Sequence, residues 1–260
     1  MLAQGNQLLL LGRFTEREIF ARFAGSTLGL FWALLGPLLL LAIYSFVFGQ
    51  LFKQRLGDDL GTDSYTLFVA VALWPWMMFS DALVRALQSI QANAPIVKKI
   101  AFPHLLLVLA AINGVFLVHF AGYVAVLAVL AATGTAVQTS GAPVALLAIA
   151  TLYLYALGIG AALAALQPML RDVEQATTPA ITMLYYLTPV LYPLALIPAE
   201  YRHWLTWNPL VYVVQRLRDG LLLGAGPQLD DLGMLLCGAA IASIGMLFFA
   251  RLSPYFEDFL

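Results

Sequence analysis

From Leu30 to Phe52 the chain carries no charged side chain. A helix over these about 23 residues would be roughly 34 Å long, and the hydrocarbon core of a bilayer is about 30 Å thick. Pro37 lies inside the run, and the carbonyl that it leaves unbonded needs a partner on a neighbouring helix. The run predicts a first membrane span.

Further apolar runs follow, separated by short polar joints. They are Tyr65 to about Ala86, Leu105–Ala132, Pro143–Leu166, Pro179–Pro198 and Leu232–Leu252. Of the 260 residues 62% are hydrophobic and 10% are charged, whereas a typical soluble domain carries about 25% charged residues. The runs are unbroken and do not alternate with period two, so they favour helices. We expect an all-α integral membrane protein with six transmembrane helices over residues 30–252, in a single domain of residues 1–260.

Residues 1–29 place charges among leucines and phenylalanines. Arg13, Arg17 and Arg22 are spaced along this stretch, which predicts an amphipathic helix in the membrane interface. An ordinary cytosolic helix leading into the first span is the alternative. Arg13 and Arg17 could hold the pyrophosphate of a lipid carrier, and ordinary lipid binding explains them equally.

The fifth run is irregular because Pro189, Pro193 and Pro198 interrupt it. Non-helical backbone at membrane depth is tolerated only beside protein or a water-filled path, so this span should bend next to one. Residues 199–231 are too polar to span and too apolar to lie free in water. They predict short re-entrant helices, with Trp204 and Trp207 as interfacial anchors.

Six spans would put both termini on one side of the membrane. The basic residues expected on that side are Arg13, Arg17, Arg22, Arg85, Lys98, Lys99, Arg171 and Arg251, and those on the other are Lys53, Arg55, Arg202, Arg216 and Arg218. Cytoplasmic loops carry an excess of Lys and Arg. We therefore expect a multi-pass protein of the bacterial cytoplasmic membrane with both termini in the cytoplasm.

The polar residues exclude several functions. None of the three lysines belongs to a GxxxxGK[ST] loop, so the chain should not bind ATP phosphates in that way. No basic block suggests nucleic-acid binding, and the single cysteine, Cys237, lies in an apolar run without metal-ligand spacing. No cofactor is expected in this chain. Asp81 and Arg85 can form a pair one turn apart, and His119 is expected to be a buried histidine bonded to a neighbouring helix rather than a proton relay.

Three ordered motifs carry a family resemblance: Arg22–Trp32 (RFAGSTLGLFW) with Pro37 and Tyr44–Gly49 (YSFVFG), Asn93–Pro103 (NAPIVKKIAFP), and Trp207–Val211 (WNPLV) with Arg218. In this order and spacing the chain resembles ABC-2 type permeases that export polysaccharide. Two departures are the spacing of Ile96-Val97-Lys98 and the loop from Gln54 to Ser64, which matches no family motif.

The resemblance implies a homodimer, docked to two copies of an ATPase subunit that binds ATP and Mg. It assigns residues 91–104 as a proline-framed coupling helix of about two turns that the ATPase pushes, with Asn93, Lys98, Lys99, Phe102 and Pro103 as its contacts. The alternative is a solvated loop whose lysines only obey the positive-inside rule. The resemblance also implies gating by the interfacial helix, through Arg13, Arg17 and Arg22.

The cargo that the resemblance implies is an undecaprenyl- or other lipid-linked polysaccharide, moved through a channel at the dimer interface among membrane lipids. Sugar faces lie flat on aromatic rings. The candidate channel residues are Tyr44, Trp74, Trp76, Tyr185, Tyr186 and Tyr192. Lipid-facing or core positions are the alternative for each. On the periplasmic loop, Asn208, Pro209, Arg216 and Arg218 could line the exit, and salt bridging within the loop is equally open.

The sequence thus predicts the membrane subunit of an ATP-driven exporter of O-antigen, capsular or teichoic-type polysaccharide. Two rivals stay open: an ABC-2 exporter of a drug or lipid, and an integral membrane glycan-transfer enzyme. The second would need clustered catalytic groups at one interface, and none stands out in the sequence.

Overall fold

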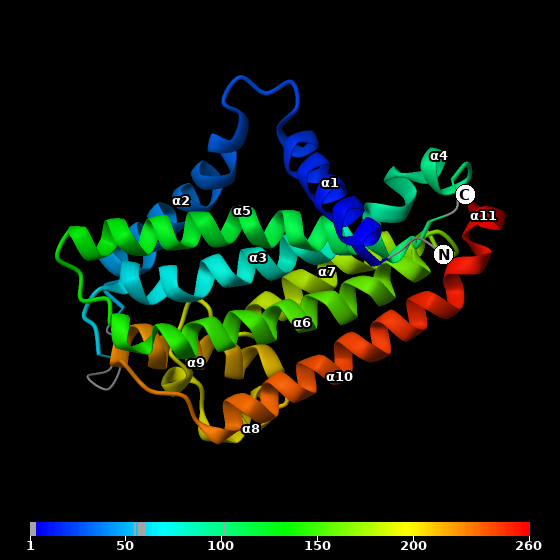
Figure 1. Ribbon diagram of the computed structural model, residues 1–260. Coiled ribbons are helices and arrows are strands. Elements are labelled where there is room, and N and C mark those ends of the chain that lie inside the picture. Colours follow the sequence, from blue (N-terminus) through cyan, green and yellow to red (C-terminus); the bar gives the residue numbers. More distant parts are fainter. Residues whose placement is uncertain (1–3, 55, 57–60, 101) are drawn as a thin grey trace.

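The computed structural model describes residues 4–54, 56, 61–100 and 102–260. These residues form helices joined by short loops (Figure 1). The α-helices are α1 (Gln4–Phe23), α2 (Trp32–Tyr44), α3 (Tyr65–Ala92), α4 (Ala94–Val97), α5 (Leu105–Ala132), α6 (Ala142–Leu166), α7 (Asp172–Tyr186), α8 (Ala199–Leu205), α9 (Pro209–Leu223), α10 (Leu229–Leu252) and α11 (Phe256–Phe259). Shorter turns are η1 (Gly29–Phe31), η2 (Ser45–Leu51, a π-helix), η4 (Thr139–Gly141), η5 (Leu194–Leu196) and η6 (Ser253–Tyr255).

In the described part of the chain, five helical segments are long and apolar enough to cross a membrane: Gly29–Leu51, Tyr65–Ala92, Leu105–Ala132, Thr139–Leu166 and Leu229–Phe259. The prediction of an all-helical, multi-pass membrane protein is therefore confirmed. The expected fifth span is not among these five, because its helix, α7, has 15 residues and is roughly 22 Å long.

Helix α7 also differs from the prediction in its limits. It begins at Asp172, inside the expected polar joint, and continues through Pro179 to Tyr186. Pro189 and Pro193 follow, and the residue before a proline is pushed out of helical conformation. The irregular stretch therefore begins after Tyr186 and runs to η5.

Helix α3 is the centre of the bundle and packs against α5, α6, α9 and α2. Ser64 caps its first turn by accepting a hydrogen bond from the Leu67 amide. Trp74 is fully buried, and Gly122 on α5 makes room for it, because a Cβ there would lie 3.1 Å from the indole ring. The core of the protein therefore forms around the second apolar run.

Helices α6 and α10 pack backbone to backbone. A Cβ at Gly158 would lie 2.4 Å from the carbonyl oxygen of Ile241, and one at Gly245 would lie 2.0 Å from that of Gly158. Two residues further along α6, Gly160 faces the methyl group of Ala86 on α3. Small residues allow such approach between spans. This surface of small residues on α6 therefore makes its contacts within the chain.

Helix α1 lies outside the bundle, along α5, and forms an inverted V with α2 (Figure 1). Leu8, Leu9 and Phe20 are 66–72% exposed on it. The same figure places α4, α11 and both marked chain ends at one end of the bundle, with α9 toward the other.

Candidate functional site: the coupling segment and the two ends of the bundle

Residues 91–104, the coupling segment, do not form the expected helix of two turns. Helix α3 continues to Ala92, and α4 is a single turn with Pro95 at its start. Helix α4 ends at Val97, and Pro103 follows at the far end of the segment. Lys98, Lys99 and Pro103 are exposed beyond α4, while Phe102 is half-buried. Ala101 lies outside the described residues, as do Arg55 and residues 1–3.

Asn93 is buried and forms hydrogen bonds within the chain, so it is not a surface contact. Its side-chain amide donates to the carbonyl of Ser89 at 2.8 Å, and its side-chain oxygen accepts a hydrogen bond from Arg17. Arg17 also lies over the ring of Phe14, 5.1 Å from its centroid. Helix α1 and the coupling segment are therefore bound together, although the predictions gave their residues separate roles.

The C-terminal end of α1 is held by a cluster of charged and polar side chains from α1, α3 and α5. Arg22 donates to Asp81 at 2.8 Å, and His119 Nε2 lies 3.0 Å from the same carboxylate oxygen. His119 is 2% exposed and bonded to a neighbouring helix, as predicted. The expected pairing of Asp81 with Arg85 is replaced by these two contacts, because α1 folds back to bring Arg22 to α3. Arg13 instead forms an exposed pair with Glu16 at 3.6 Å.

The candidate channel aromatics separate into two groups. Trp74 is enclosed within the chain, and Trp76 is buried with its ring 5.3 Å from Tyr185. Tyr185 and Tyr186 meet at 5.5 Å, and Tyr44 lies beside Phe48 at 6.3 Å. A hollow of about 160 Å³ is lined by Phe48, Gln54, Tyr185, Tyr186, Thr188, Leu191 and Tyr192. The three tyrosines of the irregular span therefore share one site, and Trp74 does not belong to it.

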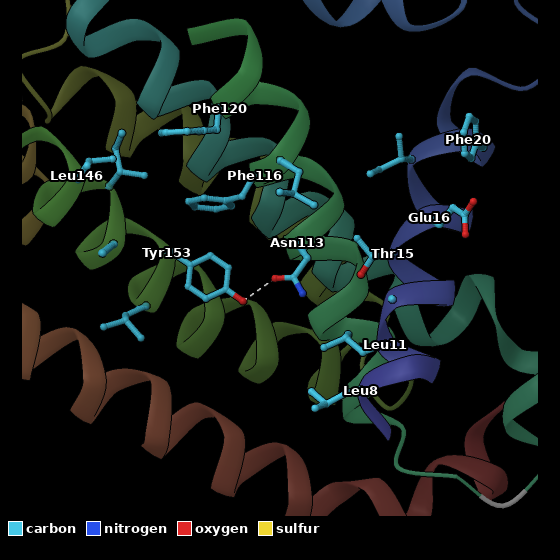
Figure 2. Close-up of a pocket in the computed structure, with 16 residues that line it drawn as sticks. Leu8, Leu11, Thr15, Glu16, Phe20, Asn113, Phe116, Phe120, Leu146 and Tyr153 are labelled. Carbon is cyan, nitrogen blue, oxygen red and sulfur yellow. Dashed lines mark hydrogen bonds between the residues drawn. The ribbon is translucent and has the colours of Figure 1, made fainter. Parts of the chain in front are cut away.

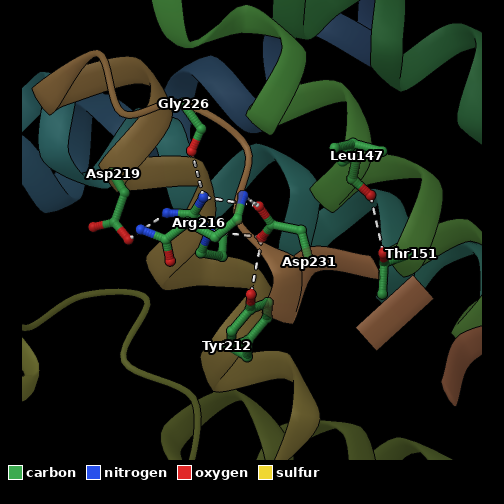
Figure 3. A network of polar contacts seen from close by, with 8 residues as sticks. Leu147, Thr151, Tyr212, Arg216, Asp219, Gly226 and Asp231 are labelled. Carbon is green, nitrogen blue, oxygen red and sulfur yellow. Dashed lines mark hydrogen bonds and ion pairs between the residues drawn. The ribbon is translucent and has the colours of Figure 1, made fainter. Parts of the chain in front are cut away.

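Arg216 and Arg218 of α9, at the opposite end of the bundle, form hydrogen bonds and ion pairs within the chain. Arg216 bonds both oxygens of Asp231, at 2.7 and 2.8 Å, and reaches Asp219 at 3.0 Å. Tyr212 donates to the same Asp231 carboxylate (Figure 3). These bonds close the turn between α9 and α10, which corresponds to the salt-bridging alternative. Asp231 and Tyr212 were not singled out from the sequence; the spacing of Gln228 and Asp231, a capping box, was the available signal.

Arg218 is buried at 5% exposure and stacks on Phe68, 3.6 Å from the ring centroid. It donates to the carbonyls of Pro189 and Val190, both at 2.7 Å. Asn208 accepts a hydrogen bond from the Leu210 amide at the start of α9, with Pro209 as the first helical residue, and donates to Thr188. Two residues predicted for the exit thus hold the irregular stretch after α7 in place.

A large apolar groove lies between α1, α5 and α6, with a volume of about 1050 Å³. Its polar groups include Asn113 and Tyr153, whose side chains are joined by a hydrogen bond of 2.7 Å (Figure 2). Phe116, Phe120 and Leu146 line the bundle side, opposite Leu8, Leu11 and Phe20 of α1. The groove was not predicted from the sequence, because it arises only when α1 packs beside α5 and α6.

Comparison with known proteins gives consistent relatives. Over 255 residues the chain is 28% identical to the O-antigen export system permease protein RfbA of Klebsiella pneumoniae, covering 96% of this chain and 95% of that protein. It is 26% identical over 221 residues to the polysialic acid transport protein KpsM of Escherichia coli, covering 84% of each. It is 28% identical over 207 residues to an O-antigen export system permease protein RfbA of Myxococcus xanthus, covering 78% of this chain and 76% of that one. Residues 10–222 match the model of the ABC-2 type transporter family, and the chain therefore belongs to that family.

Proposed function

We propose that this chain is the membrane subunit of an ATP-driven exporter that moves a lipid-linked polysaccharide across the bacterial cytoplasmic membrane. The observation that carries the proposal is similarity along nearly the whole chain to permeases named for O-antigen export and polysialic acid transport. The separate ATPase subunit, present in two copies, binds ATP and Mg and supplies the energy.

The coupling segment is the proposed contact with the ATPase. Exposed Lys98 and Lys99 lie beside Pro103 at the end of the bundle that holds both termini. Two adjacent ammonium groups suit an acidic surface on the partner. Phe102 would support the segment from inside the protein, because it is half-buried and its ring centroid lies 5.7 Å from that of Phe14 of α1. This end is cytoplasmic in the proposed orientation.

The proposal retains six membrane crossings. The start of α1 and helix α11 lie toward one end of the bundle (Figure 1), which supports an even number of crossings. Helix α7 together with the irregular residues 187–193 supplies the remaining crossing, and Arg218 and Asn208 satisfy its backbone carbonyls and polar side chains. Helix α9 is then the re-entrant element. Tyr44, Tyr185, Tyr186 and Tyr192 are the proposed sugar-contacting residues.

The export test uses the protein in a deletion strain that also contains its ATPase. The double change Lys98→Glu, Lys99→Glu should abolish surface polysaccharide while leaving the purified ATPase subunit able to hydrolyse ATP. Lys53→Glu, an exposed lysine at the other end of the first span, is the matched control. Unchanged export by the coupling variant would contradict the role of this segment. Export of a drug or lipid without polysaccharide would favour the rival cargo.

We propose that two copies of the chain meet along the first span, of whose most apolar stretch only 17% is buried. This homodimer is tested by cross-linking in the membrane after Cys237→Ser. Phe46 of the first span is 63% exposed, whereas Phe68 of α3 is fully buried. Phe46→Cys chains should cross-link to one another, and Phe68→Cys chains should not. A dimer band from the buried position, or none from the exposed one, would argue against a dimer seam at the first span.

A further inference from the structure

The last residues of the chain fold back onto the coupling segment. This C-terminal turn, Ser253–Leu260, contains η6 and α11. The Ser253 hydroxyl lies 3.0 Å from His104 Nδ1, and the Phe256 ring stacks on the His104 imidazole with centroids 6.1 Å apart. Phe256 is fully buried, although its helix is four residues long and ends the chain. So short a helix is held by its packing and not by its own hydrogen bonds.

The imidazole of His104 stands in the middle of a row of rings. On one side Phe102 meets it edge-on at 5.3 Å, and Phe102 in turn meets Phe14 of α1. On the other side Phe256 meets Phe249 of α10 edge-on at 5.3 Å. The row therefore joins three elements that are far apart in sequence: the interfacial helix, the coupling segment and the last span.

The last span does not adjoin the coupling segment in sequence. The segment continues directly into α3 before it and α5 after it, whereas α10 reaches it through the side chains of the C-terminal turn. Beyond the turn, α10 is locked to α6, because the backbones approach at Gly158 and Gly245. A displacement of the C-terminal turn would therefore move α10 and α6 together. The two backbones are in close contact at their glycines, which leaves little room for one helix to slide along the other.

We propose that the C-terminal turn and the coupling segment move as one body, with His104 as the positioning residue that joins them. A push on the segment then reaches α10 and α6 as well as α3 and α5. The inference rests on the proposed function, because it needs residues 91–104 to be the segment that the ATPase moves.

The test removes the contact between His104 and the C-terminal turn, and then restores it with a chemical cross-link in the folded protein. In a Cys237→Ser background, the double variant His104→Cys, Ser253→Cys loses the hydrogen bond and the ring stack. Its export, measured in vesicles with the ATPase, should fall about tenfold, a size typical of coupling between sites. A short, reducible bis-methanethiosulfonate that links the two thiols should restore most of that export, and reduction should abolish it again.

The rescue separates coupling from folding, because a misfolded protein would not recover when two side chains are linked. Normal export by the unlinked variant would overturn the proposal. So would a confirmed intramolecular link that leaves export low, since segment and turn would then need to move apart. Wild-type complex that moves no polysaccharide would instead sink the proposed function.

A pair of phenylalanines in the same short helix provides a second measurement. Phe256→Ala should lower export while ATP hydrolysis by the complex continues, and Phe256→Leu should recover part of it. Phe259→Ala removes a ring that is 55% exposed and should leave both unchanged. Equal effects of Phe256→Ala and Phe259→Ala would count against the joint.

Discussion

The first span and α3 are both apolar enough to cross a membrane, yet they occupy opposite situations. In α3, 78% of the most apolar stretch is buried, against 17% in Gly29–Leu51. The buried helix is the one that carries Asp81 and Arg85, whereas the exposed one has no charge from Leu30 onward. In a bilayer the lipid is as apolar as leucine, so apolarity does not draw a helix into the core. Polar contacts and shape decide which span becomes the centre.

The largest difference should come from matched tryptophans. Trp74→Ala removes a fully buried ring from α3, and we expect a loss of about 3–5 kcal/mol in the free energy of unfolding, from lost contacts and the cavity left behind. Trp32→Ala at the start of α2, where the ring is 49% exposed, should cost about 1 kcal/mol or less. Thermal unfolding of the purified protein in detergent measures both. Equal losses would erase the contrast between the spans.

A smaller difference in the free energy of unfolding is expected between a partly buried charge on α3 and an exposed one on α1. Asp81→Ala leaves Arg22 and His119 without their shared carboxylate, and it should cost about 1–3 kcal/mol, less than a fully buried pair because Asp81 is 36% exposed. Arg13→Ala breaks the exposed pair with Glu16, and it should cost about 0–1 kcal/mol. Unfolding in detergent at low and high salt compares them, and a large salt effect on the Asp81 variant would contradict a shielded cluster.

The smallest effect concerns pH and lies outside both spans. Burial lowers the pKa of His104 below its ordinary value of 6.5, with Glu257 partly opposing the shift. A released, solvated His104 therefore takes up its proton first as the pH falls through 6.5, and the docked turn loses stability below that pH. Hydrogen exchange at residues 253–260 should accelerate there, by about tenfold or less, while the amides of α3 stay protected. A His104→Asn variant should show no such acceleration, and an acceleration that persists in it would assign the effect to another group.

The candidate site was only partly predictable. The motif around Asn93–Pro103 located the coupling segment, and prolines at 95 and 103 set its limits. The helix inside the segment was predicted to be too long, because the local sequence pattern does not show that α4 ends at Val97. Asn93 had a predicted surface role, but its bonds to Arg17 and Ser89 depend on where α1 folds. The aromatic row of Phe14, Phe102, His104, Phe256 and Phe249 joins residues that no local spacing connects.

The sequence by itself determined that this is a helical, multi-pass membrane protein, because uncharged runs of span length have few other stable forms. Only the tertiary structure decided which span is the core, which arginines form buried hydrogen bonds, and that the helix of the fifth apolar run ends at Tyr186. The reason is physical: hydropathy is set residue by residue, whereas close approach at Gly122, Gly158 and Gly245 and the partners of Asp81 arise only when helices distant in sequence pack together.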